Sequence, residues 1–365
     1  MHDEDALYKL GISYLPGVGG IKARDLISYC GGIKEVFLAK KRKLLSIPGI
    51  GEKIAEAITQ SDALKLAKEE LKKIEGKDVK IISFLDESYP RNLNHYPDAP
   101  LILYIKGNID LNANRKVAIV GTRKVTNYGT IQCEKLVEQL RSYNCTIVSG
   151  LAHGVDTIAH RKAVEIGMPT IGVLGNGLKS IYPSTNHELA RRMLDNGGVI
   201  SEFAFDTKPD RENFPQRNRI IAGMADVIVV IESAIKGGSI ITAEFANNYN
   251  KDVFAIPGKL TDDFSAGCNH LIKTHKAHLL SSAEDIAYIM RWDISEAPKQ
   301  MTLMIDLLPD EEAIVNILKK QPESRLDSLH YQTQIPLGQL TSLLLNLEFK
   351  GLVRSLPGKK YILST

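Results

Sequence analysis

The sequence predicts an α/β protein in which a mostly parallel sheet, with helices on both faces, is flanked by two smaller and largely helical domains. Three observations predict this. Six apolar segments alternate with helical stretches: KVAIVG, CTIVSG, TIGVLG, GVISEF, DVIVVIE and DVFAIPG. Near-continuous apolar strands separated by helices are typical of parallel sheets buried on both faces. On either side the pattern changes to amphipathic helices, and 365 residues exceed what one hydrophobic core usually spans.

Two similar phrases mark the first region, which we expect to form a helical domain over residues 1–75. YLPGVGG, from Tyr14, and SIPGIGE, from Ser46, each place the pattern apolar-Pro-Gly-apolar-Gly before an amphipathic stretch. This pattern predicts helix-hairpin-helix turns, because glycines permit tight backbone geometry and leave N–H groups at the start of the next helix. Such turns can hold a DNA phosphate or can simply connect packed helices, and the pattern leaves both possibilities open.

The last region predicts a winged helix over residues 310–365, after a linker at 296–309. Three amphipathic segments, EEAIVNILKK, SRLDSLHYQT and PLGQLTSLLLNLEFKGLV, precede RSLPGKKYIL, which can form a two-stranded hairpin. The third helix, expected from Leu337 to Gly351, contains one lysine and no arginine. So little positive charge favours a protein-protein role over binding in a DNA groove.

Composition excludes several classes of protein. The four cysteines lie far apart and form no CxxC pair, so neither a disulfide framework nor a zinc site is predicted. No apolar run approaches the roughly 18 residues of a membrane span, and the first residues lack the basic region of a signal peptide. We therefore expect a cytoplasmic protein with no membrane partner. Because the formal net charge is only +3, any polyanion must be bound by locally arranged cations.

The loops after the predicted strands carry the candidate binding residues, because open α/β sheets bind ligands at the carboxyl ends of their strands. After the first strand, Gly121, Thr122 and Arg123 offer backbone N–H groups, a hydroxyl and a guanidinium to a phosphate. A dinucleotide-binding turn would need bare backbone where Arg123 stands. Gly238 and Ser239, at the start of a later helix, form a second candidate anion site.

The most informative loop is NFPQRNRIIAGMAD. Arg217, Asn218 and Arg219 are expected just before or within the first turn of a helix, where arginines are unfavourable unless an anion neutralises them. Phe214 adds an aromatic face to these cations, and single-stranded nucleic-acid sites use this combination. The loop therefore predicts phosphate binding together with base stacking.

The same loops are also compatible with purely structural roles. Phe214 could belong to the core, and the arginines could pair with carboxylates such as Glu202 or Glu232. Lys179, in VLGNGLKSIYPSTN, is a candidate DNA-binding cation, but a structural turn accounts for that loop about equally well.

Metal binding and catalysis are not expected. His153 and His160 are seven residues apart, which on one helix separates them by two turns, and Asp156 is better suited to a helix cap or a polar brace. No nucleophile-base pair and no GxxxxGK[ST] motif accompanies the loops. We therefore expect a non-enzymatic protein that needs no cofactor and holds a nucleic-acid strand without cutting it.

In their order along the chain, IVGTRKVTNYG, IVSGLAHGVDTIAH, VLGNGLKSIYPSTN, GVISEF, NFPQRNRIIAGMADVIVVIES, GGSIITAEFA and DVFAIPG closely resemble the DNA-processing protein A family, also called DprA or Smf. The resemblance implies a bacterial protein with a Rossmann-like domain over residues 76–295, including an N-terminal extension at 76–114. It also implies that this domain binds single-stranded DNA and forms a homodimer, and that the protein helps to load the RecA recombinase during natural transformation. The flanking regions resemble the family's helix-hairpin-helix or sterile-alpha-motif-like domain and its winged helix.

The family's motifs fall on the loops described above. Its Gly-Ser-Arg phosphate loop matches residues 121–123, with a threonine in place of serine that keeps the hydroxyl. Its Phe-Pro-x-Arg-Asn-Arg segment matches residues 214–219, and its Ser-Gly-Ser turn matches residues 237–239. Some members carry a DNA-binding lysine where Ser184 stands here, so Lys179 is the candidate to replace it.

Two further functions match parts of the sequence. A nucleoside-monophosphate phosphoribohydrolase of the related Rossmann-like group is the alternative, because GGSIITAE loosely resembles that group's Gly-Gly-x-Gly-Thr-x-x-Glu turn. Ile240 stands where that turn has its last glycine, and the two flanking domains have no obvious use in such an enzyme. A scaffold that has lost ligand binding is disfavoured, because loop arginines without an anion cost stability.

Overall fold

The computed structural model describes residues 2–293, 308–320, 324–350, 352–356 and 358–363. The chain divides into two compact units, Met1–Ser295 and Glu296–Thr365. The first unit combines an all-helical N-terminal region with a nine-stranded sheet, and the second is a small helical unit with a three-stranded sheet. The domain boundary predicted at residues 75 and 76 falls inside the first unit and stays a prediction. The linker predicted at 296–309 lies mostly outside the described residues.

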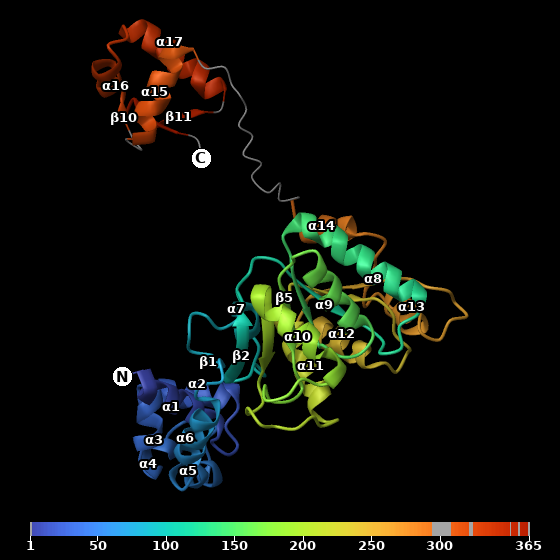
Figure 1. Cartoon of the computed structure of the whole chain (residues 1–365). Helices are drawn as coiled ribbons and strands as arrows, with labels where there is room; N and C mark the ends of the chain where they lie inside the picture. Colours follow the sequence, from blue (N-terminus) through green and yellow to red (C-terminus); the bar gives the residue numbers. More distant parts are fainter. Residues whose placement is uncertain (1, 294–307, 321–323, 351, 357, 364–365) are drawn as a thin grey trace. The chain divides into compact units, whose positions relative to one another are not determined.

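The N-terminal helices pack together beside the first two strands of the sheet (Figure 1). Ile12, Leu26 and Leu44 are fully buried, and they belong to the same apolar cluster as Leu103 of the sheet. The region therefore shares its core with the sheet. Its helices are α1 (His2–Ser13), α2 (Gly20–Cys30), α3 (Ile33–Leu38), α4 (Lys41–Leu45), α5 (Glu52–Thr59) and α6 (Ala63–Ile74).

The large sheet has the strand order β1-β2-β6-β5-β4-β3-β7-β8-β9. The strands from β6 to β9 in this order are parallel, whereas β1 and β2 run antiparallel to their neighbours. The predicted mostly parallel, Rossmann-like sheet is thus confirmed. Its strands are β1 (Lys80–Ser83), β2 (Ile102–Asn108), β3 (Lys116–Val120), β4 (Thr146–Ser149), β5 (Thr170–Val173), β6 (Gly197–Ser201), β7 (Val227–Val230), β8 (Asp252–Ala255) and β9 (His278–Leu279).

Helices cover both faces of the sheet because successive side chains of a strand point to opposite sides. Val117 and Ile119 of β3 pack with α8, α9 and α14, whereas Ala118 and Val120 pack with α11, α12 and α13. No helix in the described ranges is long and apolar enough to span a membrane. The helices are α7 (Arg91–Asn94), α8 (Asn127–Leu140), α9 (Val155–Glu165), α10 (His187–Met193), α11 (Asn213–Met224), α12 (Gly238–Asn248), α13 (Ala266–Lys273) and α14 (Ala283–Met290), with short 3-10 turns η1 (Arg141–Tyr143), η2 (Ser184–Asn186) and η3 (Leu194–Asn196).

The strand order reverses at β3. The chain moves from β3 to β4 on one side, and it later returns to place β7 on the other side. The loops that follow β3 and β7 therefore leave the sheet in opposite directions and open a crevice between them, which is where ligands bind in sheets of this kind.

The second unit is the predicted winged helix. Helices α15 (Pro309–Lys320), α16 (Leu326–Thr333) and α17 (Leu337–Phe349) surround a core that contains Ile314, Leu329 and Leu340. Its sheet has the order β10-β12-β11 and is formed by β10 (Ser324–Arg325), β11 (Val353–Leu356) and β12 (Lys360–Leu363).

A buried carboxylate at the start of α15 is bonded to the residue that follows α17. Glu311, in the first turn of α15, accepts hydrogen bonds from Lys350 Nζ, at 2.7 Å, and from the backbone N–H of Leu308, at 3.0 Å. The hydrogen bond from Lys350 lowers the pKa of Glu311, and the Leu308 N–H acts in the same direction. Glu311 is 1% exposed, so water cannot replace these partners.

We predict that Glu311→Gln removes a pH-dependent part of the stability of the winged helix. A depressed carboxylate pKa contributes stability above the ordinary value near 4.5, and this contribution is lost as the pH falls through the lower folded value. Hydrogen exchange of α17 amides in the full chain, at pH 7 and at about pH 4, measures this pH-dependent stability. The variant should exchange faster than the wild type at pH 7, and the difference should shrink in acid. An equal difference at both pH values would contradict the role of the charge.

Candidate functional site

A cavity of about 590 Å³ opens at the carboxyl ends of the parallel strands, where the strand order reverses. Its walls are the loops after β3, β4, β5 and β7 and the N-terminal parts of α11 and α12. We call this cavity the pocket. It includes eight of the ten predicted binding residues: Gly121, Thr122, Arg123, Phe214, Arg217, Asn218, Gly238 and Ser239.

The loop after β3 is fixed by backbone hydrogen bonds and presents the guanidinium of Arg123 at the surface. The N–H of Thr122 donates to the carbonyl of Glu232, at 2.7 Å, and the carbonyl of Thr122 accepts from the N–H of Val155, at 3.2 Å. The Thr122 hydroxyl accepts from the N–H of Lys124. Arg123 is exposed, and its guanidinium lies over the ring of Phe214, 5.5 Å from the ring centre.

Two aromatic rings stand together at this side of the pocket. Phe214 packs against the backbone of Gly175, and its ring centre lies 5.7 Å from that of Tyr182. Tyr182 is 46% exposed. Arg123, Phe214 and Tyr182 therefore form a continuous cation-aromatic surface, the kind on which an unstacked base can lie.

Arg217 lies deeper than predicted. Only 3% of it is exposed, its Nη1 donates to the carbonyl of Val173 at the end of β5, and its Nε has no hydrogen-bond partner among the described residues. Burial lowers the pKa of Arg217 to about 10, which still leaves it charged at neutral pH. A Cβ at Gly150 would lie 2.0 Å from Nη1, so a side chain at this position would displace the guanidinium. Arg217 thus forms the floor of the pocket.

Asp156 compensates this buried charge. One carboxylate oxygen accepts from the N–H groups of Gly150 and Ala152, at 3.1 and 3.3 Å. Burial raises the pKa of Asp156, and the positive charge of Arg217 opposes that rise. Asp156 therefore braces the loop after β4, as one of the two sequence-based interpretations suggested, and it faces the same pocket as Arg217.

The start of α11 differs from the expectation. The helix begins at Asn213, so Arg217 to Arg219 lie in its second turn and not before or within the first. Pro215 does not prevent this, because the N–H that proline lacks would have no partner inside the first turn. The argument from unfavourable charges in a first turn therefore does not apply, and the positions of the arginines follow from helix geometry.

Two predicted binding residues lie outside the pocket. Arg219 forms an ion pair with Glu202. This is the structural alternative for the loop, in which its arginines pair with carboxylates. Lys179 is exposed and lies close enough to Asp206 to contribute, after Lys73, to lowering the pKa of that carboxyl. Neither side chain lines the cavity. Their assignment to DNA binding stays a prediction without support from the pocket geometry.

The start of α12 forms another part of the pocket wall. This helix begins at Gly238 with Gly237 as its N-cap and without a side-chain cap, so its first N–H groups are available to an anion. The amide of Asn218 donates to the carbonyl of Gly238, at 3.4 Å, and joins α11 to α12. The hydroxyl of Ser239 is buried and donates to Ser233 Oγ, at 2.7 Å, which positions the turn.

Sequence reasoning missed Tyr182 and Arg211, which also line the pocket. Arg211 is exposed just before α11, and its nearness to the NFPQRNR phrase could have drawn attention to it. Tyr182 lies in the YPSTN stretch, where the family resemblance pointed only to Ser184. Its position opposite Phe214 depends on how two distant loops pack, and the sequence carries no signal for that.

The histidines that suggested a metal lie apart. His160 is buried and its Nδ1 lies 2.7 Å from Thr170 Oγ1, whereas His153 is exposed. Burial lowers the pKa of His160 to about 3, so this ring is neutral. Among the described residues, no group of three or more His, Cys, Asp and Glu side chains has a geometry that could hold a metal ion.

Sequence and structure comparisons agree on one family. Residues 80–291 match the family model described as DNA recombination-mediator protein A, and residues 299–359 match the DprA winged helix domain. The chain is 30% identical to protein Smf of Synechocystis over 99% of both chains. It is 43% identical to the DNA processing protein DprA of Streptococcus pneumoniae over 56% of this chain and 72% of that protein.

Two solved structures resemble the fold. The crystal structure of DprA from Streptococcus pneumoniae covers 79% of this chain and 97% of its own, with a TM-score of 0.66 and 35% identity. DprA of Helicobacter pylori, whose structure is described in terms of its single-stranded DNA binding mode, covers 58% of this chain and 95% of its own, with a TM-score of 0.53 and 30% identity. With a family model matched over more than half of its length and a relative matched from end to end, this chain belongs to the DprA/Smf family of DNA-processing proteins.

Proposed function

We propose that this chain is a non-catalytic protein that binds single-stranded DNA in the pocket. The observation that carries the proposal is the exposed guanidinium of Arg123 over the ring of Phe214, which also contacts Tyr182, in a pocket whose floor is Arg217. Arginine pairs with phosphate oxygens and stacks on aromatic rings, so one surface can hold both parts of a nucleotide. The single-stranded DNA binding described for the Helicobacter pylori relative supports this assignment.

The pocket favours a single strand over a duplex. The bases of a duplex are stacked and paired, so Phe214 and Tyr182 can only reach a base that is free on one face. The uncapped start of α12 and the guanidinium of Arg123 both line the pocket, so that a strand can meet backbone N–H donors and a cation in the same cavity. Gly121, Thr122, Asn218, Gly238 and Ser239 shape these walls.

Membership of the family supports a wider role. We propose that the protein is a bacterial, cytoplasmic recombination mediator that protects incoming single-stranded DNA and helps to load RecA during natural transformation. We also propose that it acts as a homodimer formed through the Rossmann-like domain. The match to the family model for recombination mediators supports the mediator role, and the absence of a membrane-spanning helix from the described ranges is consistent with the location.

The hydrolase alternative receives no support from the pocket. Asp156 is the acid among the described residues that line it, and its carboxylate is held by two backbone N–H groups of the loop after β4. A general base must instead reach the reacting group of a substrate.

We predict that Arg123→Ala weakens single-stranded DNA binding about tenfold, because it removes one charge-assisted phosphate contact. Fluorescence anisotropy of a labelled oligothymidylate at two salt concentrations measures the change, and the salt slope should fall by about 0.7 per lost contact. Lys65→Ala is the matched control, because Lys65 is exposed on α6 and lies outside the pocket. Unchanged binding by the Arg123 variant, or displacement of the strand by a mononucleotide, would count against the proposal.

Arg217 is expected to act mainly through the fold. Arg217→Met leaves Asp156 buried without its compensating charge and should lower the free energy of unfolding by about 3 kcal/mol at pH 7. Burial raises the pKa of Asp156, so the folded state binds the Asp156 proton more tightly than the unfolded state does. At pH 5 protonation therefore relieves part of the cost of the unpaired carboxylate, and the loss of unfolding free energy should be smaller than at pH 7. Urea unfolding at both pH values measures this, and the double variant with Asp156→Asn should recover part of the loss. Equal losses at both pH values would exclude the charge effect.

The mediator role predicts faster RecA filament formation on single-stranded DNA that is coated with a single-strand-binding protein. The wild-type chain should shorten the lag of RecA ATP hydrolysis on this DNA, whereas Arg123→Ala should do so less, because it holds the strand more weakly. A wild-type chain that binds DNA but leaves the lag unchanged would confine the function to DNA binding.

A further inference from the structure

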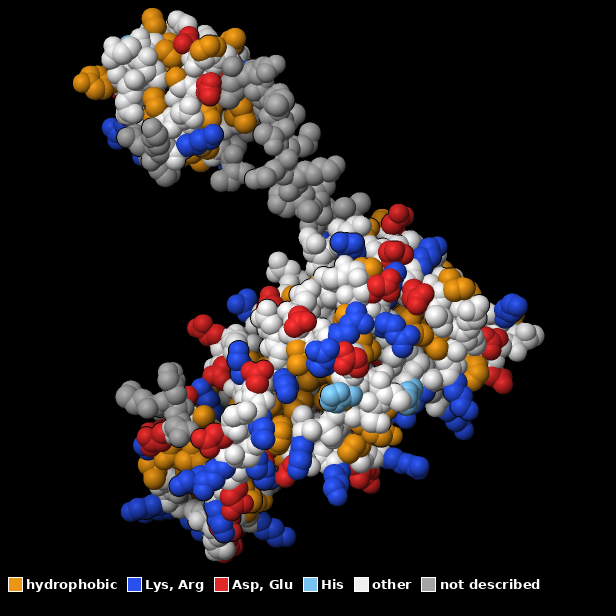
Figure 2. Space-filling model, viewed as in Figure 1, with side chains coloured by type: hydrophobic (Ala, Val, Ile, Leu, Met, Phe, Trp, Pro, Cys, Tyr) orange, Lys and Arg blue, Asp and Glu red, His pale blue; other side chains and the backbone are white. Residues whose placement is uncertain are grey.

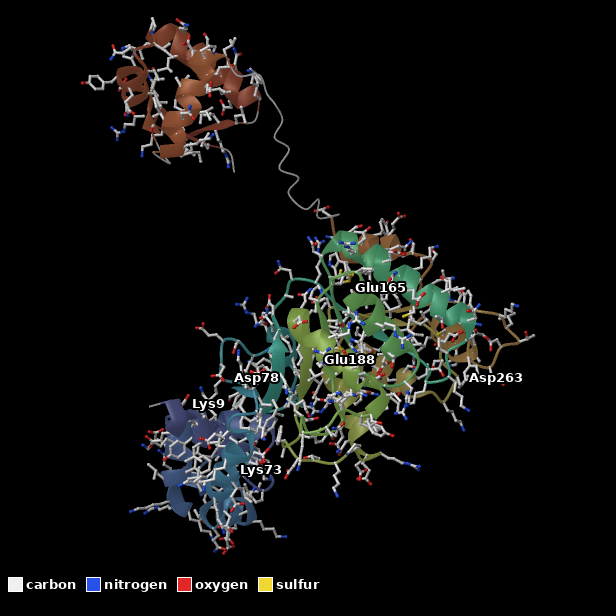
Figure 3. The ribbon with its side chains drawn as sticks, in the orientation of Figure 1. Lys9, Lys73, Asp78, Glu165, Glu188 and Asp263 are labelled. Carbon is white, nitrogen blue, oxygen red and sulfur yellow. The ribbon has the colours of Figure 1, made fainter. Side chains whose placement is uncertain are left out.

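The N-terminal helical region contacts a segment that leads directly to the pocket. Glu70 of α6 is 2% exposed, and its carboxylate accepts a hydrogen bond from the backbone N–H of Phe205. Lys73, one turn later, pairs with Glu70 at 3.3 Å and with Asp206 at 3.1 Å. Figure 3 shows Lys73 where the N-terminal helices meet the part of the chain that carries the sheet.

This contact is buried and specific. Phe205 is 9% exposed and packs in one apolar cluster with Leu10 of α1 and Ala67 of α6. Burial raises the pKa of Tyr104 in β2, and the adjacent Tyr14 hydroxyl and Glu70 carboxylate raise it further. A buried carboxylate is costly unless its partners are in place, so Glu70 ties α6 firmly to residues 204–207.

Residues 204–207 in turn hold the loop that follows β5. The carbonyl of Phe205 accepts from the N–H of Lys179, and the carbonyl of Thr207 accepts from the N–H of Gly177, both at 2.9 Å. The two backbones approach so closely that a Cβ at Gly177 would lie 2.1 Å from the carbonyl oxygen of Ala204. A shift of residues 204–207 must therefore move the loop as well.

The same loop forms the aromatic side of the pocket. Gly175, at its start, is the backbone on which the Phe214 ring packs, and Tyr182, at its end, faces Phe214. The side chain of Asn176 closes the loop by donating to the carbonyls of Gly177 and Ser180, at 2.9 and 2.8 Å. A continuous series of contacts thus runs from Glu70 to Tyr182.

We infer that Glu70 is a positioning residue for single-stranded DNA binding: through Phe205 and the loop at 175–182 it holds Tyr182 and Phe214 in place. The N-terminal helical region thereby sets the affinity of a pocket to which it contributes no lining residue. This inference rests on the proposed function of the pocket. It deepens that proposal by assigning a role in DNA binding to a region that does not touch the strand there.

Glu70→Ala in the full chain tests the inference. We expect affinity for labelled oligothymidylate to fall about tenfold, because the N–H of Phe205 loses an ionised acceptor and the aromatic side of the pocket loosens. The salt slope should stay unchanged, because no phosphate-binding cation is removed. Hydrogen exchange at the amides of Gly177 and Lys179 should become faster. Glu70→Gln keeps an acceptor for Phe205 and should recover most of the affinity.

Lys73→Ala and Gly177→Ala provide independent evidence where Glu70→Ala fails to fold. Lys73→Ala removes the partner of Glu70 and Asp206, and its matched control is Lys72→Ala, on an exposed neighbour outside the pocket. Gly177→Ala pushes the loop and residues 204–207 apart from the other side. Both variants should weaken binding without changing the salt slope, and Lys72→Ala should not.

The outcomes separate this inference from the proposed function. A wild-type chain that does not bind single-stranded DNA would overturn the function of the pocket. A wild-type chain that binds, together with Glu70 or Lys73 variants that exchange faster at Gly177 but bind equally well, would leave the function intact. It would overturn the positioning role and reduce Glu70 to a stabilising contact.

Discussion

The pocket depends on one buried guanidinium. Arg217 lies under the carboxyl ends of β4 and β5, where it donates to the carbonyl of Val173 and occupies the space that a side chain at Gly150 would take. A charge at this depth is tolerated because Asp156, held by loop N–H groups, lies in the same pocket. Phe214 and Asn218 lie on the same helix as Arg217, so its contacts help to hold these two pocket residues in place. The more exposed residues of the pocket are thus supported by one that is only 3% exposed.

The electrostatics of the molecule are local. Acidic and basic side chains are interspersed over the face shown in Figure 2, in keeping with a formal net charge of +3. A field of this size does not by itself attract a polyanion. The positive groups that matter are those that converge on the pocket, where Arg123 and Arg211 stand near the surface and Arg217 below them. Arg219, which lies outside the pocket, instead pairs with Glu202.

Much of the fold could be predicted, because strand periodicity and glycine-bounded loops are local signals. The same signals located the pocket at the carboxyl ends of the strands, and eight of ten candidate residues line it. The depth of a side chain was not predictable in this way. Arg217 and Arg219 are two residues apart in one helix, so they point in different directions, and the sequence cannot say which direction meets Glu202 and which meets β5. Tyr182 was missed because its place in the pocket arises from contact between the loop after β5 and the first turn of α11, more than 30 residues further along the chain.

The antiparallel edge of the sheet explains why a helical region can matter to a distant pocket. β2 pairs with β6, and the chain that leaves β6 at Ser201 must pass the N-terminal helices before it enters α11. Along this path it meets Glu70 on one side and the loop after β5 on the other. This segment cannot move independently of either neighbour, because the backbone of Phe205 is bonded to both Glu70 and Lys179. The connection that brings Phe214 into the pocket is therefore also the connection that carries the influence of α6. A strand bound against Phe214 would in turn hold residues 204–207 more firmly against α6, since coupling between two sites is reciprocal.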